Sequence, residues 1–202
     1  MPTANAEDLL EFWFGDALAS AERLEARSQL WFRQSDAFDA EIGQRFRALP
    51  ERAASGALDA WREGAEPCLA FVLAVDQLPR NLFRGSARAF AFDPLGREAA
   101  LSAIARGFDR DLHPVQAAFL YLPLEHAEDV EMQERSVQLY AALGERAPGQ
   151  IRAQFDQYSE YARRHRDVIR RFGRFPHRNG MLERPSTPEE VAYLESGGDT
   201  FG

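Results

Sequence analysis

The stretch IRAQFDQYSEYARRHRDVIRRF, residues 151–172, has the clearest helical pattern in the chain, and GRFPHRN, residues 173–179, follows it directly. In the first part, apolar residues and His165 recur every three or four positions, which predicts a long amphipathic helix with one buried face. Gly173 and Pro176 predict the end of that helix and a stiff turn. The turn carries two arginines, a histidine and an asparagine, so polar side chains gather directly behind the helix.

The rest of the chain repeats this periodicity between proline and glycine residues. We expect helices that begin at Asn5, Ser20, Asp93, Pro114 and Thr187, one through Phe38–Leu49 ended by Pro50, one from Pro67, and one from Pro123 to near Gly144. No run of strand alternation occurs. The sequence therefore predicts an all-α fold of eight to ten helices, packed as antiparallel pairs in a single domain, residues 1–202.

One predicted helix, from Pro67 to Leu78, is apolar on all sides, which is typical of a buried helix. Asp76 is its only charged residue. Because an unpaired carboxylate would be costly there, we expect Asp76 to pair with Arg80, one turn later. Cys68 is the only cysteine, so no disulfide can form within the chain. We interpret Cys68 as a core residue and not as a nucleophile.

Composition excludes several functional classes. The net charge of -8 argues against DNA, RNA or an anionic membrane as a partner. The longest apolar run, Leu69–Val75, is too short to cross a bilayer, and the first ten residues lack the features of a signal peptide. We therefore expect a cytoplasmic protein without nucleic-acid or membrane partners. Phosphate-binding glycine loops are absent from the sequence, and we predict no cofactor and no metal.

Several short motifs together match the pattern of one bacterial family. They are Asp76–Asn81, Phe83–Gly85, Tyr121–His126, Phe172–Asn179 and Ser186–Glu190. In these motifs, and over nearly its whole length, the chain resembles the family called Domain of Unknown Function 924. The resemblance implies an all-α fold of the tetratricopeptide-like class, and it implies no activity and no catalytic residue. Leu78, Ala127 and Glu183 stand where the family usually has Phe, Ser and Gly.

Two donor-rich segments echo each other, since Pro79–Asn81 with Arg84 resembles Pro176–Asn179 with Arg184. The predicted ligand-binding donors are Arg80, Asn81, Arg84, Arg174, His177, Arg178, Asn179 and Arg184. Converging guanidinium groups beside a histidine and an asparagine would form a receptor for a carboxylate or a phosphate. The alternative is that each arginine pairs with a buried acid such as Asp76, or caps the end of a helix.

A second polar group is Glu125-His126-x-x-Asp129. On one helix, Glu125 and Asp129 would lie one turn apart, and His126 would share a face with Asp129. The three could act as an acid/base group or supply metal ligands. A hydrogen-bonded polar seam between helices is the favoured interpretation, because the residue order differs from that of di-iron bundles. We expect His165, on the apolar stripe, to be a core histidine bonded to a carbonyl or a carboxylate.

Three functional hypotheses follow, in this order. The first is a helical binding module whose pocket holds an acidic small molecule or a peptide carboxylate with the donors named above, together with Glu125 and His126. The second is that the motif residues only build the fold. The third is an enzyme, a hydrolase or transferase of an acidic metabolite, in which His126 or His177 is the acid/base and Asp129 or Glu125 orients it.

Overall fold

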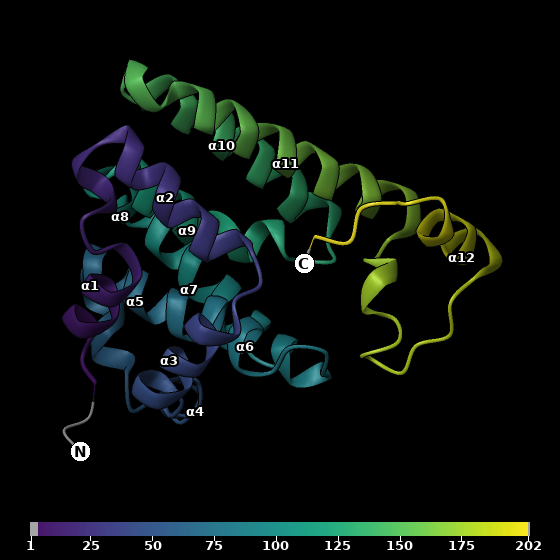
Figure 1. Cartoon of the computed structure of the whole chain (residues 1–202), viewed down its shortest axis with the longest axis horizontal. Helices are drawn as coiled ribbons and strands as arrows, with labels where there is room; N and C mark the ends of the chain where they lie inside the picture. The colour runs from purple at the N-terminus through teal and green to yellow at the C-terminus, as the bar shows by residue number, and fades with distance from the viewer. Residues whose placement is uncertain (1–3, 202) are drawn as a thin grey trace. The chain divides into compact units, whose positions relative to one another are not determined.

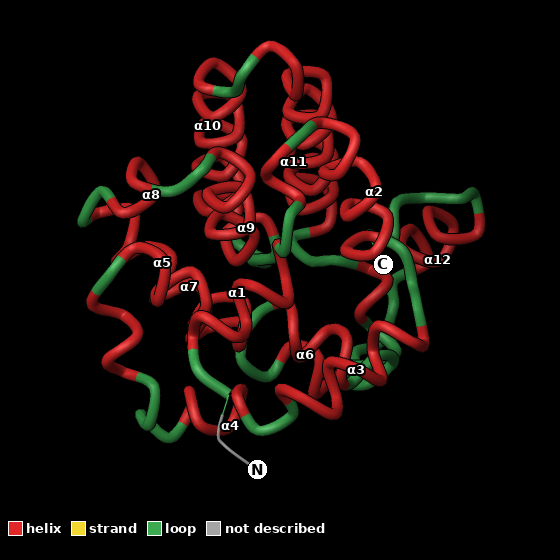
Figure 2. The backbone as a smooth tube through the Cα atoms, turned by 60° about the vertical axis from the view of Figure 1, so that its left-hand side comes forward, coloured by secondary structure: helices red, strands yellow, loops and turns green. Residues whose placement is uncertain are grey.

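The structure, a computed structural model, describes residues 4–201 and is built from helices (Figure 1). No strand occurs in residues 4–201 (Figure 2), which confirms the all-α prediction. This part of the chain contains twelve α-helices and five short 3-10 helices, more than the eight to ten predicted, because several helices have only four to six residues. The chain divides into two compact units, one with residues up to Arg84 and Arg88–Pro123, the other with Gly85–Ala87 and the chain from Leu124 onward. The assignment of both units to a single domain, residues 1–202, stays a prediction.

The first unit is organised around one fully buried helix, α5. Its helices are α1 (Ala6–Phe14), α2 (Ala21–Phe32), α3 (Asp36–Phe46), α4 (Leu49–Ala54), α5 (Ala65–Val75), α6 (Gln77–Leu82), α7 (Asp93–Ala105), α8 (Phe108–Asp111) and most of α9 (Pro114–Glu125). Short 3-10 helices are η1 (Ala17–Ala19), η2 (Asp59–Glu63) and all but the first residue of η3 (Ala87–Phe90). Helix α5 contacts α1, α4, α6 and α7, so it forms the centre of this unit.

Helix α5 confirms the predicted buried helix. Its residues from Cys68 to Val75 are each at most 2% exposed. The helix begins at Ala65, two residues before the predicted start at Pro67, because proline is tolerated in the first turn. Gly96 lets α7 approach closely, since a Cβ atom there would lie 3.3 Å from Val75. Burial raises the pKa of the Cys68 thiol to about 11, which is typical of an unreactive core cysteine.

Aromatic side chains join the first helices of this unit to α9. The Trp13 ring lies 5.7 Å from that of Phe38 and 5.9 Å from that of Phe119, between ring centroids. Trp31 packs edge-on against Phe119 at 4.7 Å, and its Nε1 donates to the Trp13 carbonyl over 2.9 Å. Because each buried aromatic ring removes a large apolar area from water, this cluster supplies much of the packing between α1, α2, α3 and α9.

Most predicted helix starts are confirmed. Asn5 and Thr187 both form capping boxes, each with an acidic residue three positions later. The prediction for Pro50 is wrong: α3 ends at Phe46, and Pro50 is the second residue of α4, where its missing N–H has no cost. Asp93 before Pro94 predicts an N-cap followed by proline at the first helical position, but α7 begins at Asp93 itself and its N-cap is Phe92.

The predicted helix from Pro123 to Gly144 is also wrong. Pro123 lies inside α9, which continues to Glu125, and a new helix, α10, begins at Val130. The break occurs because Asp129 is extended, with φ -150° and ψ 120°, and its carboxylate accepts from the backbone N–H groups of Glu131 and Met132. Asp129 is therefore an N-cap and not a residue within a helix.

The second unit contains a pair of long helices, α10 (Val130–Arg146) and α11 (Arg152–Phe172), which pack side by side (Figures 1 and 2). A short turn with η4 (Gly149–Ile151) joins them, so they run antiparallel. Helix α11 begins one residue later than predicted and ends at Gly173, whose left-handed φ of 70° ends the helix as expected. The chain continues through η5 (Pro176–Arg178) to α12 (Pro188–Glu195).

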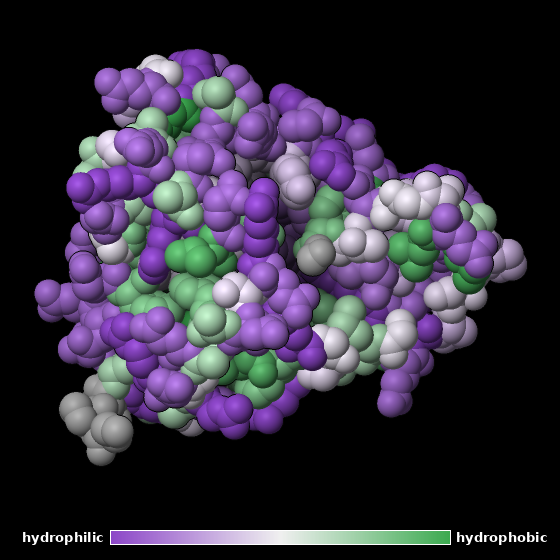
Figure 3. Space-filling view, in the orientation of Figure 1, coloured by the Kyte–Doolittle hydropathy of each residue, from purple (hydrophilic) through white to green (hydrophobic). Residues whose placement is uncertain are grey.

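The surface drawn in Figure 3 is mostly hydrophilic, with small scattered apolar areas. Among the described residues, no helix has the length and apolar character needed to cross a membrane.

Candidate functional site

In the first unit, Arg80 is bound by two acids. Its Nη1 donates to the Asp76 carbonyl over 2.7 Å and lies 3.3 Å from the Asp76 carboxylate. It also forms a two-bond pair with Asp93, with distances of 2.9 and 3.0 Å. Asp76 is fully buried, so the predicted pairing of Asp76 with Arg80 is confirmed and has a third member.

Asn81 and Arg84 both donate to one carboxylate, that of Asp39 in α3. Asn81 Nδ2 lies 2.7 Å from Asp39 Oδ1, and Arg84 Nε lies 2.5 Å from Asp39 Oδ2. A second guanidinium nitrogen of Arg84 lies 3.1 Å from Oδ1. The three predicted donors of this unit are therefore bonded to its own acids, and they join α6 and its C-terminal end to α3 and α7.

In the second unit, Arg184 and Glu128 hold the turn that follows α11. Arg184 donates to both carboxylate oxygens of Glu128, over 2.5 and 2.9 Å, and to the Phe175 carbonyl over 3.3 Å. The Phe175 N–H donates to the same carboxylate over 2.8 Å. Burial would raise the pKa of Glu128, but the bonds from Arg184 and Phe175 outweigh it, so this pKa is lowered and the carboxylate stays ionised.

Arg174 and Asn179 are bonded to a second acid, Glu190 in α12. Arg174 donates to both Glu190 oxygens over 2.6 and 2.8 Å, and Asn179 Nδ2 lies 3.2 Å from Oε2. Hydrogen bonds from Arg174 are the main reason that the pKa of Glu190 falls to about 2, although burial opposes it and the Thr187 cap supports it. Two of the predicted arginines thus fix the 173–190 segment to α12 and to the α9–α10 connection.

Arg178 lies differently in the same unit. Its side chain is buried, its Nη1 donates to the His126 carbonyl over 3.0 Å, and its guanidinium lies over the Phe175 ring at 4.4 Å. This contact brings two predicted site residues, His126 and Arg178, together from segments that are 52 positions apart. A guanidinium that stacks on an aromatic ring can still donate hydrogen bonds, because its N–H groups point outward in the plane of the guanidinium.

Beside Arg178 lies a group of aromatic rings built around His165. The His165 ring is stacked on Phe201 at 3.6 Å and lies 5.7 Å from Phe175 and 6.4 Å from His126. Its Nδ1 lies 2.9 Å from the Tyr161 carbonyl and 3.2 Å from the Glu125 carboxylate. Burial holds the pKa of His165 well below its usual value, so the ring is neutral and Nδ1 carries the proton that it donates. The prediction of a core histidine bonded to a carbonyl or a carboxylate is confirmed.

His177 is a predicted site residue with a ring nitrogen that the fold leaves without a hydrogen bond. Its Nδ1 is buried and has no hydrogen-bond partner. Burial, followed by the positive charge of Arg178, lowers the pKa of His177 to about 4. At neutral pH the ring is therefore neutral, and it offers one N–H donor and one acceptor nitrogen.

The expected group of Glu125, His126 and Asp129 is not on one helix. Glu125 is the last residue of α9 and its side chain faces His165, whereas Asp129 caps α10. The prediction that these three residues share a helix face is therefore wrong. No cluster of three or more histidine, cysteine, aspartate or glutamate side chains within residues 4–201 is placed to hold a metal ion.

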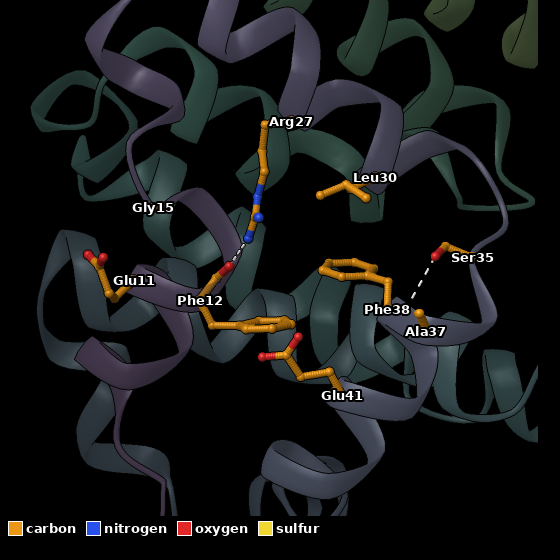
Figure 4. Close-up of a pocket in the computed structure, with 9 residues that line it drawn as sticks. All are labelled: Glu11, Phe12, Gly15, Arg27, Leu30, Ser35, Ala37, Phe38 and Glu41. Atoms are coloured by element: carbon orange, nitrogen blue, oxygen red, sulfur yellow. Dashed lines mark hydrogen bonds between the residues drawn. The ribbon is translucent and has the colours of Figure 1, made fainter.

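A separate hollow of about 360 Å³ lies in the first unit (Figure 4). Its lining consists of Glu11, Phe12, Gly15, Arg27, Leu30, Ser35, Ala37, Phe38 and Glu41. The rings of Phe12 and Phe38 stack at 5.3 Å, and Arg27 donates to the carbonyls of Trp13 and Phe12 at the end of α1. Because its cation is bonded to backbone carbonyls and its other charged residues are carboxylates, this hollow does not suit an acidic ligand.

Sequence reasoning missed three residues of the second unit: Glu128, Glu190 and Phe201. In the sequence, Glu190 stands out only as the last residue of the Ser186–Glu190 motif, although its carboxylate binds Arg174. Glu128 and Phe201 gave no local signal, because their partners Arg184 and His165 lie far away in the sequence.

Comparisons with known proteins agree with the motifs. The model of the family described as "Bacterial protein of unknown function (DUF924)" matches residues 9–198. The solved structure of a protein of unknown function from Agrobacterium tumefaciens is 43% identical, with a TM-score of 0.80 over 95% of this chain and 97% of that one. No curated protein matches the sequence. The matched family model covers almost the whole chain, which therefore belongs to the DUF924 family of bacterial proteins.

Proposed function

We propose that this chain is a cytoplasmic, non-catalytic binding module with tetratricopeptide-like helix pairs, and that it holds an acidic small molecule or a peptide carboxylate. The binding residues in this proposal are His177 and Arg178, in the turn after α11, with His126 next to them. The observation that carries the proposal is the buried His177 Nδ1, which has no hydrogen-bond partner.

A buried polar atom without a partner is unfavourable, because it has lost its water and gained nothing in return. An anionic oxygen at His177 Nδ1 would supply the missing partner and would accept the N–H of one tautomer. The turn is only half-buried at His177, so a ligand oxygen from outside the fold is proposed as that partner.

The electrostatic surroundings of His177 favour an anion. Burial is the main cause of its lowered pKa, and the positive charge of Arg178 comes second; Glu128 acts in the opposite direction and Arg184 in the same direction as Arg178. Because Arg184 is paired with Glu128, the charge of Arg178 is the one that would stabilise a carboxylate or a phosphate beside His177.

Two of the predicted arginines, Arg174 and Arg184, are left out of the proposed binding residues. Arg174 and Arg184 form two-bond pairs with Glu190 and Glu128, so we assign them to holding the turn in place. The binding function then rests on His177 and Arg178, and Arg174 is not expected to touch the ligand.

The test is a thermal-shift screen with phosphates, mono- and dicarboxylates and peptides with a free carboxylate. A ligand at a hundred times its Kd stabilises the native state by about 2.7 kcal/mol. We expect at least one acidic compound to raise the melting temperature of the natural protein, and we expect His177→Phe and Arg178→Lys to lose most of that increase. Arg163→Ala, which alters an exposed arginine of α11, should keep it.

Histidine NMR gives an independent readout. An anion bound at His177 should raise the pKa of that ring above about 4, because it stabilises the imidazolium, and should leave His113 in the first unit unchanged. The proposal fails if no acidic compound stabilises the protein, or if His177→Phe and Arg178→Lys respond to the active compound as the natural protein does.

A further inference from the structure

Phe201 fills a slot whose walls are aromatic rings. Its ring stacks on His165 at 3.6 Å, with 22° between the planes. Three more rings face it edge-on or tilted, those of Phe175 at 5.8 Å, His177 at 6.2 Å and Tyr161 at 6.5 Å. We call the four rings other than Phe201 the ring slot. An aromatic ring fits such a slot by stacking and edge contacts as well as by burial.

The segment that carries Phe201 is attached to α11 and α12 mainly through Asp199 and through the backbone N–H groups of Gly197 and Gly198, which donate to the carbonyls of Leu194 and Tyr193. Asp199 forms an ion pair with Arg164, and the Asp199 N–H donates to the Tyr193 hydroxyl over 2.7 Å. The two side chains of this ion pair are 41% and 26% exposed, so water screens the pair. Gly197 has a left-handed φ of 82°, which gives the backbone freedom to turn there.

Phe201 itself has a positive φ of 49°, a conformation that L-residues with large side chains adopt at a cost. A segment with a partly buried ion pair as its anchor, a glycine turn and a strained residue can leave the ring slot more easily than a helix could. Phe201 remains only partly buried even when it is stacked, which is consistent with a replaceable group.

We propose that Phe201 occupies the place of a ligand's aromatic ring, and that the acidic ligand of this protein is an aromatic carboxylate for which the 197–201 segment is an internal competitor. This proposal rests on the proposed function. Its basis is that the ring slot and the two anion-binding residues are continuous: Arg178 lies over the Phe175 ring at 4.4 Å, and His177 is itself one wall of the slot. A ligand with a ring in the slot would place its carboxylate next to these donors.

The test measures the binding of 3-phenylpropionate by calorimetry to the full chain and to three variants. Phe201→Ala empties the slot, Asp199→Asn weakens the anchor without touching a wall, and Val191→Ala, an exposed residue of α12, is the matched control. We expect Phe201→Ala to bind the probe at least about tenfold tighter than the natural protein, Asp199→Asn to bind with intermediate affinity, and Val191→Ala to show no change.

Two further probes separate this proposal from the proposed function. Cyclohexanepropionate has the acid without an aromatic ring, and 3-phenylpropanol has the ring without the acid. If Phe201→Ala binds both acids more tightly by the same factor, or binds no probe more tightly, the aromatic slot is overturned. The acid-binding function would still be tested separately by His177→Phe and Arg178→Lys. A gain for the alcohol equal to that for 3-phenylpropionate would support the slot and would overturn the acidic ligand.

Discussion

Arg184 and Glu128 form a two-bond ion pair, with nitrogen–oxygen distances of 2.5 and 2.9 Å, across a separation of 56 residues. Both side chains are about three-quarters buried, at 24% and 23% exposure. The same carboxylate accepts the Phe175 N–H, so one acid from the α9–α10 connection fixes both the start and the end of the 175–184 turn. The position of His177 and Arg178 within that turn therefore depends on Glu128.

Replacement of Glu128 by alanine should destabilise the protein by roughly 2–3 kcal/mol, because Arg184 and the Phe175 N–H both lose a charged acceptor in a mostly buried place. Urea denaturation gives the free energy of unfolding. The control is Glu160→Ala, which removes an exposed pair with Arg163 and should cost no more than about 0.5 kcal/mol. Similar losses in both variants would show that the Glu128 pair is no stronger than a surface pair.

Glu190 should give the protein an acid-sensitive component of stability. Its pKa is about 2 in the folded chain and 4.5 ordinarily, so its contribution is complete above pH 4.5 and is lost as the pH falls through about 2. We expect the difference in unfolding free energy between the natural protein and Glu190→Gln to shrink from pH 6 to pH 3. Glu189→Gln, which removes an exposed pair with Arg171, should show a small difference at both values.

His165 and His177 should also make the free energy of unfolding depend on pH, in a range above that of Glu190. Their pKa values are lowered on folding, that of His177 from 6.5 to about 4, so the unfolded chain binds more protons and stability falls as the pH drops from about 6.5 toward 4. Each ring contributes at most about 1.4 kcal/mol per pH unit. Denaturation of His177→Phe between pH 4.5 and 7.5 should show a shallower dependence. An unchanged slope would mean that His177 keeps its ordinary pKa in the native protein.

In the first unit, Arg80→Ala should cost roughly 3–5 kcal/mol, because it takes the guanidinium away from the fully buried Asp76 carboxylate. Arg45→Ala is the comparison, since Arg45 forms an exposed pair with Glu41 at the same i,i+4 spacing. Thermal and urea unfolding should show that Arg80→Ala lowers the free energy of unfolding several times more than Arg45→Ala does. Equal effects would indicate that Asp76 is neutralised by other groups.

The sequence was sufficient for features that depend on neighbouring positions. The stripe from Phe155 to Ile169 and the left-handed Gly173 defined α11 almost to the residue, and the i,i+4 spacing identified the pairing of Asp76 with Arg80. Each of these signals lies within one or two turns of the helix that it describes.

Features that depend on distant positions could not be predicted in this way. The sequence predicts a helix start at Pro123, but Leu120 and Leu124 are fully buried on either side of it, and this packing keeps α9 helical through the proline. The partners of Arg174 and Arg184 are 16 and 56 positions away, so no local pattern shows which acids they bind. The candidate site was therefore identified by its donors, and the acids that hold it were not.

Because Cys68 is buried within α5, the reactivity of its thiol can be used to measure how often α5 becomes exposed. A thiol that is 2% exposed, with a pKa of about 11, reacts with a maleimide or a disulfide reagent only while α5 is transiently unpacked. The labelling rate of the unmodified chain thus reports how often its innermost helix is exposed. A cysteine introduced at the surface could also carry a fluorophore with almost no background from the natural thiol.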